Sequence, residues 1–122
     1  MRLYAVSGSA ARQRTDCAIV GLYESGSLSA AAARLGIQLA EPPFEVTLAE
    51  RRIVVVHDPR ALDDAFAPDH HLALHGHTHR HAEDRSAGRL VFNPGECAGH
   101  VAGLNAIGIV DLTTLDARLV RF

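Results

Sequence analysis

The chain has 122 residues, of which 48% are hydrophobic and 21% charged, with a formal net charge of -2 at pH 7. This length suits one domain with one hydrophobic core. The small net charge provides no electrostatic footprint for nucleic acid or an anionic membrane, and no apolar run is long enough for a bilayer span or a signal peptide. Cys17 and Cys97 form no Cys-x-x-Cys pair, which argues against a disulfide framework. We therefore expect a cytoplasmic globular protein.

Short strands are predicted at residues 2–6 and 17–20, because each is apolar and ends at a serine or glycine. Ser27 or Ser29 is a candidate N-cap for an alanine-rich helix over residues 30–35, which Gly36 would close. Two prolines at 42 and 43 then break regular structure. A hairpin of strands 44–48 and 52–56 is expected to follow.

The second half of the chain alternates short helical and extended patterns. Leu62, Ala65 and Phe66 lie at helical spacing, which predicts an amphipathic helix over residues 60–66 that covers one face of a sheet. Strands are expected at 72–75 and 89–92, separated by a polar loop at 81–88. A terminal hairpin is expected at 106–111 and 117–122. The pattern predicts an α/β fold with a mixed sheet and a C-terminal β-hairpin.

Six of the eight histidines fall between residues 70 and 81, and three of them form the sequence His-Gly-His-Thr-His at 75–79. Neutral imidazole is a common ligand of divalent metals. If the strand at 72–74 runs straight into this segment, the rings of His77 and His79 point to the same side. Gly76 would let the backbone turn there.

Polar loops follow two other predicted strands. His57 comes directly after a β-branched run at 52–56, and Asn-Pro-Gly occupies 93–95. Ligands gather at the loops beyond the strand ends of open α/β sheets. We therefore expect His57, His77 and His79 to converge on one metal ion.

These segments, with the closing run at 103–111, resemble the C-terminal half of a calcineurin-like metallophosphoesterase. The specific motifs are Gly-His-Thr-His at 76–79 and Asn-Pro-Gly-Glu-Cys-Ala-Gly at 93–99, and they are most similar to the small prokaryotic phosphodiesterase branch. The resemblance implies a truncated metallophosphoesterase β-sandwich flanked by helices. It predicts a single partial domain over residues 1–122, with a divergent part at 1–34 and a family-like part at 35–122.

The resemblance also implies a site for two divalent metals, of the kind Mn, Ni, Zn or Fe, at which a metal-bound hydroxide attacks a phosphodiester substrate. By family position, His57 and His77 would bind one metal and His79 the other. Asp58 stands where the family has glycine, and is either a further carboxylate ligand or a turn residue before a proline. The imidazole of a buried His75 would support the ligands.

Asn93 and Gly95 are expected to shape the loop beside this site, because Asn-Pro-Gly forms turns by its own chemistry. The opening of the chain departs from the family pattern. The family's Asp-x-His motif is missing, and Gly8, Ser9 and Ala10 stand in its place. No bridging carboxylate can be assigned, so the metal site could also be mononuclear or absent.

Two functions therefore remain open from the sequence. One is a metal-dependent phosphoesterase, and the other is a non-catalytic scaffold that retains the fold, as the retromer subunit of this family does. A partial domain would also leave unpaired strand edges, which recruit other strands. We therefore expect a homo-oligomer.

Overall fold

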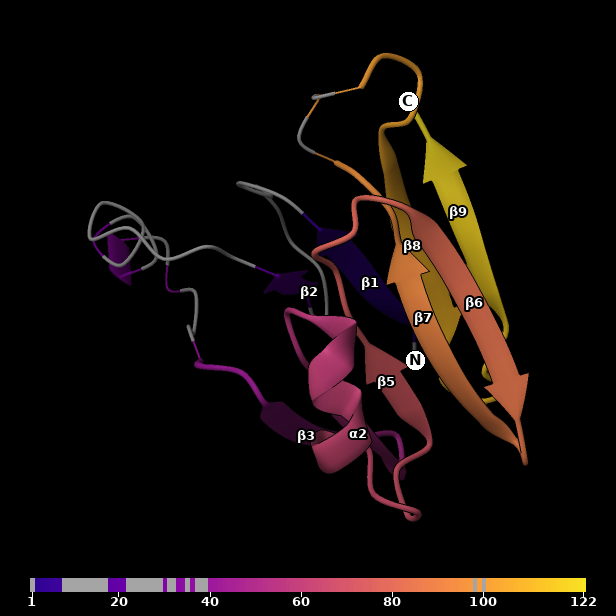
Figure 1. The fold of residues 1–122 in the computed structure, drawn as a ribbon. Helices are drawn as coiled ribbons and strands as arrows, with labels where there is room; N and C mark the ends of the chain where they lie inside the picture. Colours follow the sequence, from indigo (N-terminus) through magenta and orange to yellow (C-terminus); the bar gives the residue numbers. More distant parts are fainter. Residues whose placement is uncertain are drawn as a thin grey trace.

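The structure is a computed structural model that describes residues 2–7, 18–21, 30, 33, 34, 36, 40–97, 99 and 101–122. One group of strands comprises β1 (Arg2–Ser7), β2 (Ala18–Gly21), β8 (Ala106–Asp111) and β9 (Ala117–Arg121). The other comprises β3 (Phe44–Leu48), β4 (Arg51–Val55), β5 (Leu72–Leu74), β6 (His81–Ser86) and β7 (Arg89–Pro94). They form a smaller sheet in the order β2-β1-β8-β9 and a larger sheet in the order β3-β4-β5-β7-β6 (Figure 1).

The main hydrophobic core lies between the two sheets. Alternate residues of the larger sheet face inward because side chains alternate along a strand. The larger sheet contributes Ile53, Val55, Leu72, Leu74, Leu90 and Phe92, and Val110, Leu112 and Leu115 lie opposite them. The sheets are in close contact at Gly108, where an added Cβ would lie 2.3 Å from Cε1 of Phe92. Only a glycine fits beneath that ring.

The other face of the larger sheet is covered by a short helical segment (Figure 1). This segment is a 3-10 turn, η1 (Pro59–Ala61), followed by one α-helical turn, α2 (Leu62–Ala65). Leu62, Ala65 and Phe66 pack against a small buried cluster, which consists of Val54 of β4, Val56 just beyond that strand and Ala73 of β5. The predicted helix over residues 60–66 is therefore correct in position and in its buried face, but it is only one α-helical turn long.

Strands β4, β5 and β7 run parallel, with Val55 opposite Leu74 and Leu74 opposite Phe92. Their carboxyl ends consequently lie at one edge of the larger sheet. The backbone pairing continues past the strand ends, because the Gly76 N–H donates to His57 O at 3.1 Å. The loops that follow β4 and β5 are thereby held side by side.

The polar loop predicted at residues 81–88 was wrong. Residues 81–86 form β6, which pairs antiparallel with β7, and only Ala87 and Gly88 make the turn, with φ angles of 50° and 74°. Every residue of β6 is exposed. A strand with no buried face shows no apolar alternation, which is the signal on which strand prediction depends.

The predicted hairpins at 44–56 and 106–122 are confirmed. At the first, Ala49 and Glu50 both have positive φ angles, 47° and 62°, as the two central residues of a type I′ turn require. The mixed sheet and the C-terminal hairpin thus agree with the α/β fold predicted from the sequence.

The first 40 residues are described only in part. The strands predicted at 2–6 and 17–20 correspond to β1 and β2. In the predicted helix, Ala30, Ala33 and Arg34 are helical, and the N–H of Gly36 (φ 67°) donates to Ala33 O at 3.4 Å. The proposed caps Ser27 and Ser29, together with Cys17, lie outside the described residues. In the described part of the chain, no helix is long and apolar enough to cross a membrane.

Candidate metal centre

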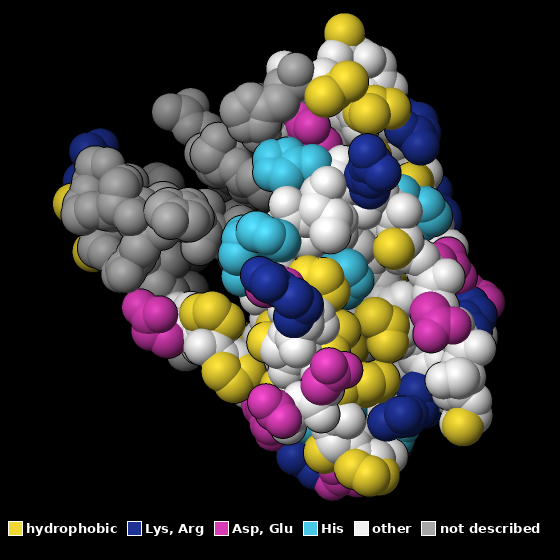
Figure 2. All heavy atoms as spheres, in the orientation of Figure 1, with side chains coloured by type: hydrophobic (Ala, Val, Ile, Leu, Met, Phe, Trp, Pro, Cys, Tyr) yellow, Lys and Arg dark blue, Asp and Glu magenta, His cyan; other side chains and the backbone are white. Residues whose placement is uncertain are grey.

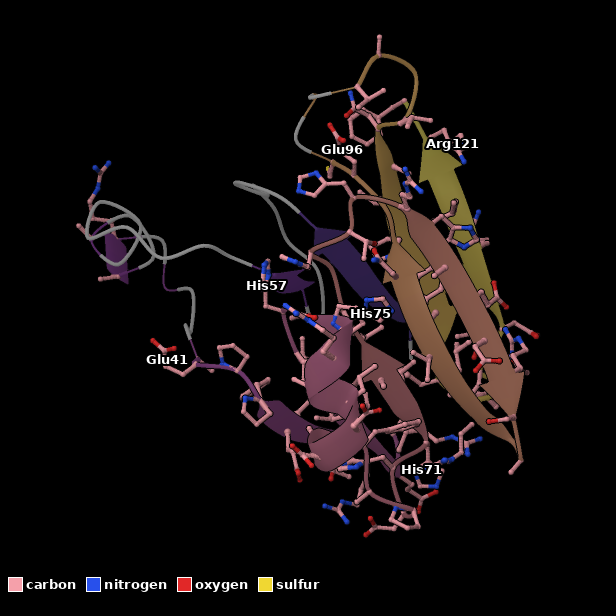
Figure 3. All side chains as sticks on the ribbon, viewed as in Figure 1. Glu41, His57, His71, His75, Glu96 and Arg121 are labelled. Carbon is pink, nitrogen blue, oxygen red and sulfur yellow. The ribbon has the colours of Figure 1, made fainter. Side chains whose placement is uncertain are left out.

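The candidate site lies at the edge where β4, β5 and β7 end. Figure 3 shows His57 and His75 at this end of the larger sheet and His71 at the opposite end. In the space-filling view, histidine side chains gather on the face above α2 (Figure 2). The parallel order of the strands therefore brings together loops that are 20 and more residues apart in the sequence.

His57 and His77 form a close pair of potential ligands. Nε2 of His57 lies 3.2 Å from Nδ1 of His77, and the two rings meet edge to face with centroids 5.1 Å apart. Two nitrogens that each lie about 2.1 Å from one zinc ion are roughly 3.0 to 3.4 Å apart for bond angles between a right angle and the tetrahedral value. The observed separation suits two imidazoles bound to the same ion.

The backbone of the histidine loop differs from the one predicted. β5 ends at Leu74, and the left-handed φ angles fall at His77 (64°) and His79 (56°), not at Gly76. Strand alternation therefore does not set the directions of the two rings. A left-handed conformation costs a residue with a Cβ roughly 1–2 kcal/mol, and such conformations cluster at functional sites.

Asp58 has a structural role and also lies beside His77. Its Oδ1 accepts a hydrogen bond from the Arg60 N–H at 2.9 Å, which caps η1. The side-chain hydrogen bonds of Arg60, followed by this backbone hydrogen bond, hold the pKa of Asp58 well below its usual range. The carboxylate is thus charged, and its Oδ2 lies 3.8 Å from Nε2 of His77. It stands at the ring nitrogen that does not face His57.

His79 faces a second carboxylate. Its Nδ1 lies 3.5 Å from Oε2 of Glu96, a residue only 2% exposed. The other oxygen of Glu96 accepts the Val101 N–H at 2.9 Å. Glu96 belongs to the family motif at 93–99, but no role was predicted for it from the sequence. The available signal was an acidic residue directly after the Asn-Pro-Gly turn at a strand end.

Asn93 is fully buried and ties the histidine loop to β7. Its Nδ2 donates to Gly76 O at 3.0 Å and to Thr78 Oγ1 at 3.1 Å, and its Oδ1 accepts the Gly95 N–H at 2.9 Å. Gly95 has a φ of 88°, and an added Cβ would lie 3.1 Å from the backbone N of His81. The turn at 93–95 therefore depends on the side chain of Asn93 and on the absence of a side chain at Gly95.

His75 is buried at the start of the histidine loop, with 9% of its surface exposed. Its backbone N–H donates to Phe92 O at 3.1 Å. Burial lowers the pKa of its imidazole, which favours the neutral ring. Burial also raises the pKa of the Cys97 thiol, which disfavours the thiolate form.

The remaining histidines lie elsewhere or are not described. Nδ1 of His70 accepts the Ala67 N–H at 2.9 Å, and Nδ1 of His71 accepts the Arg52 N–H at 3.0 Å. His100 lies outside the described residues, as do the residues at 8–10. Among the residues that are described, no three His, Cys, Asp or Glu side chains lie close enough together to hold a metal ion. Within the described residues, the candidate ligands form two pairs, His57–His77 and His79–Glu96.

Comparison with known proteins identifies relatives of this chain. A curated phosphodiesterase of Methanocaldococcus jannaschii is 42% identical over 40 residues, which is 33% of this chain and 24% of that protein. A solved structure described as a novel archaeal phosphodiesterase is 27% identical with a TM-score of 0.57, and the match covers 65% of this chain and 50% of that one. The chain therefore spans half or less of the length of these relatives.

Other solved structures share the fold at lower identity. A predicted phosphoesterase from Streptococcus pneumoniae has a TM-score of 0.64 at 14% identity, over 98% of this chain and 88% of that one. Vps29 from Entamoeba histolytica, solved with zinc, has a TM-score of 0.62 at 12% identity, over 100% of this chain and 98% of that one. The family model for the calcineurin-like phosphoesterase superfamily domain matches residues 2–115. The chain therefore belongs to the calcineurin-like phosphoesterase superfamily, as the motifs of its sequence indicated.

Proposed function

We propose that this protein hydrolyses phosphodiesters with the help of divalent metal. The observation that carries the proposal is the His57–His77 pair, whose ring nitrogens are 3.2 Å apart at the carboxyl edge of the parallel strands. The similarity to archaeal phosphodiesterase, found both in sequence and in structure, supports the reaction class. Because the chain spans only part of those proteins, the substrate is proposed only as a class.

Nε2 of His57 and Nδ1 of His77 would hold one ion, and His79 would hold the second. Imidazole donors suit Mn, Ni, Zn or Fe. When bound, a divalent ion lowers the pKa of a coordinated water to about 7 and neutralises charge on phosphoryl oxygens. The chain itself orients the ligands. Asp58 faces His77, and Asn93 fixes the loop between the two candidate ligands through its bonds to the backbone and to Thr78.

The test is metal binding and hydrolysis of bis(p-nitrophenyl) phosphate by the purified chain with Mn²⁺ or Ni²⁺. His77→Ala should lose activity and should weaken metal binding by at least about 100-fold in calorimetry, since even residues behind the ligands cost 10- to 100-fold. His71→Asn is the matched control, because His71 lies at the opposite end of the sheet. Unchanged binding and hydrolysis in His77→Ala would refute the proposal.

A non-catalytic scaffold is the second candidate. It is favoured by the departure at Gly8, Ser9 and Ala10 and by the lack of a three-ligand cluster within the described residues. Elemental analysis and calorimetry separate the two functions. A folded chain that contains no transition metal, and takes up none, would support the scaffold.

We also propose that the chain forms a homo-oligomer. The supporting feature is β6, which lies at the edge of the larger sheet with all its residues exposed. Free strand edges pair readily with further strands. Sedimentation velocity should show a dimer or larger species, and a single monomeric species at micromolar concentration would contradict this.

A further inference from the structure

Glu96 is the most deeply buried carboxylate at the site, and each of its two oxygens faces a different nitrogen. The residue is 2% exposed, its Oε1 accepts the Val101 N–H at 2.9 Å, and its Oε2 lies 3.5 Å from Nδ1 of His79. We propose that Glu96 is a positioning residue that keeps the proton of His79 on Nδ1, so that Nε2 carries the lone pair available to an ion. This role rests on the proposed metal function and deepens it.

The chemistry of the Glu96–His79 pair determines which tautomer of His79 is favoured. An ionised carboxylate can only accept hydrogen bonds, so the ring nitrogen that faces it is favoured as the donor. A neutral imidazole carries one proton, and a proton on Nδ1 leaves Nε2 as the basic nitrogen. Carboxylates that orient metal-binding histidines in this way fix both the tautomer and the direction of the ring.

The backbone holds Glu96 in place from both sides. Its carbonyl accepts the Ala106 N–H at 2.8 Å, which joins the loop to the start of β8. On the other side, the chain at Gly95 passes close to the backbone of His81. A Cβ added at Gly95 would lie 3.1 Å from His81 N. The backbone that carries Glu96 is therefore bonded to the start of β8 and packed against the start of β6, and a rigid backbone is what an orienting group needs.

Asp58 favours the opposite tautomer at His77. The carboxylate of Asp58 lies 3.8 Å from Nε2 of His77, and Nδ1 of the same ring faces His57. Two carboxylates on different loops thus favour opposite tautomers of two histidines that are two residues apart. His77 would bind through Nδ1 and His79 through Nε2.

The first experiment reads the tautomer directly. Long-range ¹H–¹⁵N NMR of metal-free protein at about pH 8, above the ordinary imidazole pKa of about 6.5, should show His79 protonated on Nδ1. Glu96→Gln should move that proton to Nε2. In this variant the Val101 N–H still donates to the side-chain oxygen of the glutamine, so the amide NH₂ faces His79 and donates to its Nδ1. Glu83→Gln, an exposed change on β6, is the control and should leave His79 unaltered.

A native His79 protonated on Nε2, or an unchanged tautomer in a folded Glu96→Gln protein, would overturn the inference. If the variant does not fold, the native spectrum alone decides. The second readout is Mn²⁺ or Zn²⁺ affinity, which should fall about 10- to 100-fold in Glu96→Gln while the His77 tautomer stays the same. A tautomer switch in a chain that binds no metal would refute the proposed function only, and metal binding without the switch would refute only the role of Glu96.

Discussion

Replacement of Asn93 by alanine should destabilise the protein through the loss of three hydrogen bonds. The side chain is fully buried, donates to Gly76 O and Thr78 Oγ1, and accepts the Gly95 N–H. Each bond contributes about 1 kcal/mol, and more where a buried partner is left unsatisfied. We therefore expect Asn93→Ala to lower the free energy of unfolding by about 3 kcal/mol, and the melting temperature by roughly 10 °C.

Urea denaturation followed by far-UV circular dichroism measures this loss, because the chain contains no tryptophan for a fluorescence signal. Thr78→Val is the matched control. It removes the bond from Asn93 together with the longer bonds of the Thr78 hydroxyl to Arg80 N (3.3 Å) and Arg80 O (3.4 Å), at an exposed threonine, and should cost about 1 kcal/mol. A loss of less than about 1 kcal/mol in Asn93→Ala would show that the loop is held by other contacts, and the reasoning from hydrogen bonds would be wrong.

Two further predictions follow from the core and from the buried imidazole. Gly108→Ala should cost about 1–3 kcal/mol of stability in thermal melts, because its Cβ would overlap the ring of Phe92, and Phe92→Leu in the same chain should recover part of that loss. Burial lowers the pKa of His75, so the unfolded chain takes up the proton first as the pH falls. The stability of metal-free protein should therefore decrease below about pH 6.5, and a pH series of denaturation curves should show a smaller decrease in His75→Gln.

The sequence predicts the scaffold of the site well, for physical reasons. The β-branched run before His57 and the short apolar run before His75 are strands buried on both faces, and such strands read as continuous apolar stretches. Glycine and proline mark where they stop. Parallel pairing then follows from the helical crossover between β4 and β5, and it places the strand ends at one edge.

The details of the loops could not be read in the same way. β6 was missed because it has no buried face. The left-handed angles of His77 and His79 depend on tertiary contacts, including the bonds from Asn93 to the same loop. Glu96 was missed because its burial and its contact with His79 join parts of the chain that are distant in sequence, and the residue types alone carry no sign of either.

The backbone angles at His77 and His79 bear on how this chain would change under selection. Both positions suit glycine or asparagine better than histidine. A library selected only for heat resistance should therefore discard these two imidazoles early, each time gaining roughly 1 kcal/mol. If variants with improved thermal stability still keep both histidines, a property other than stability is under selection at these positions.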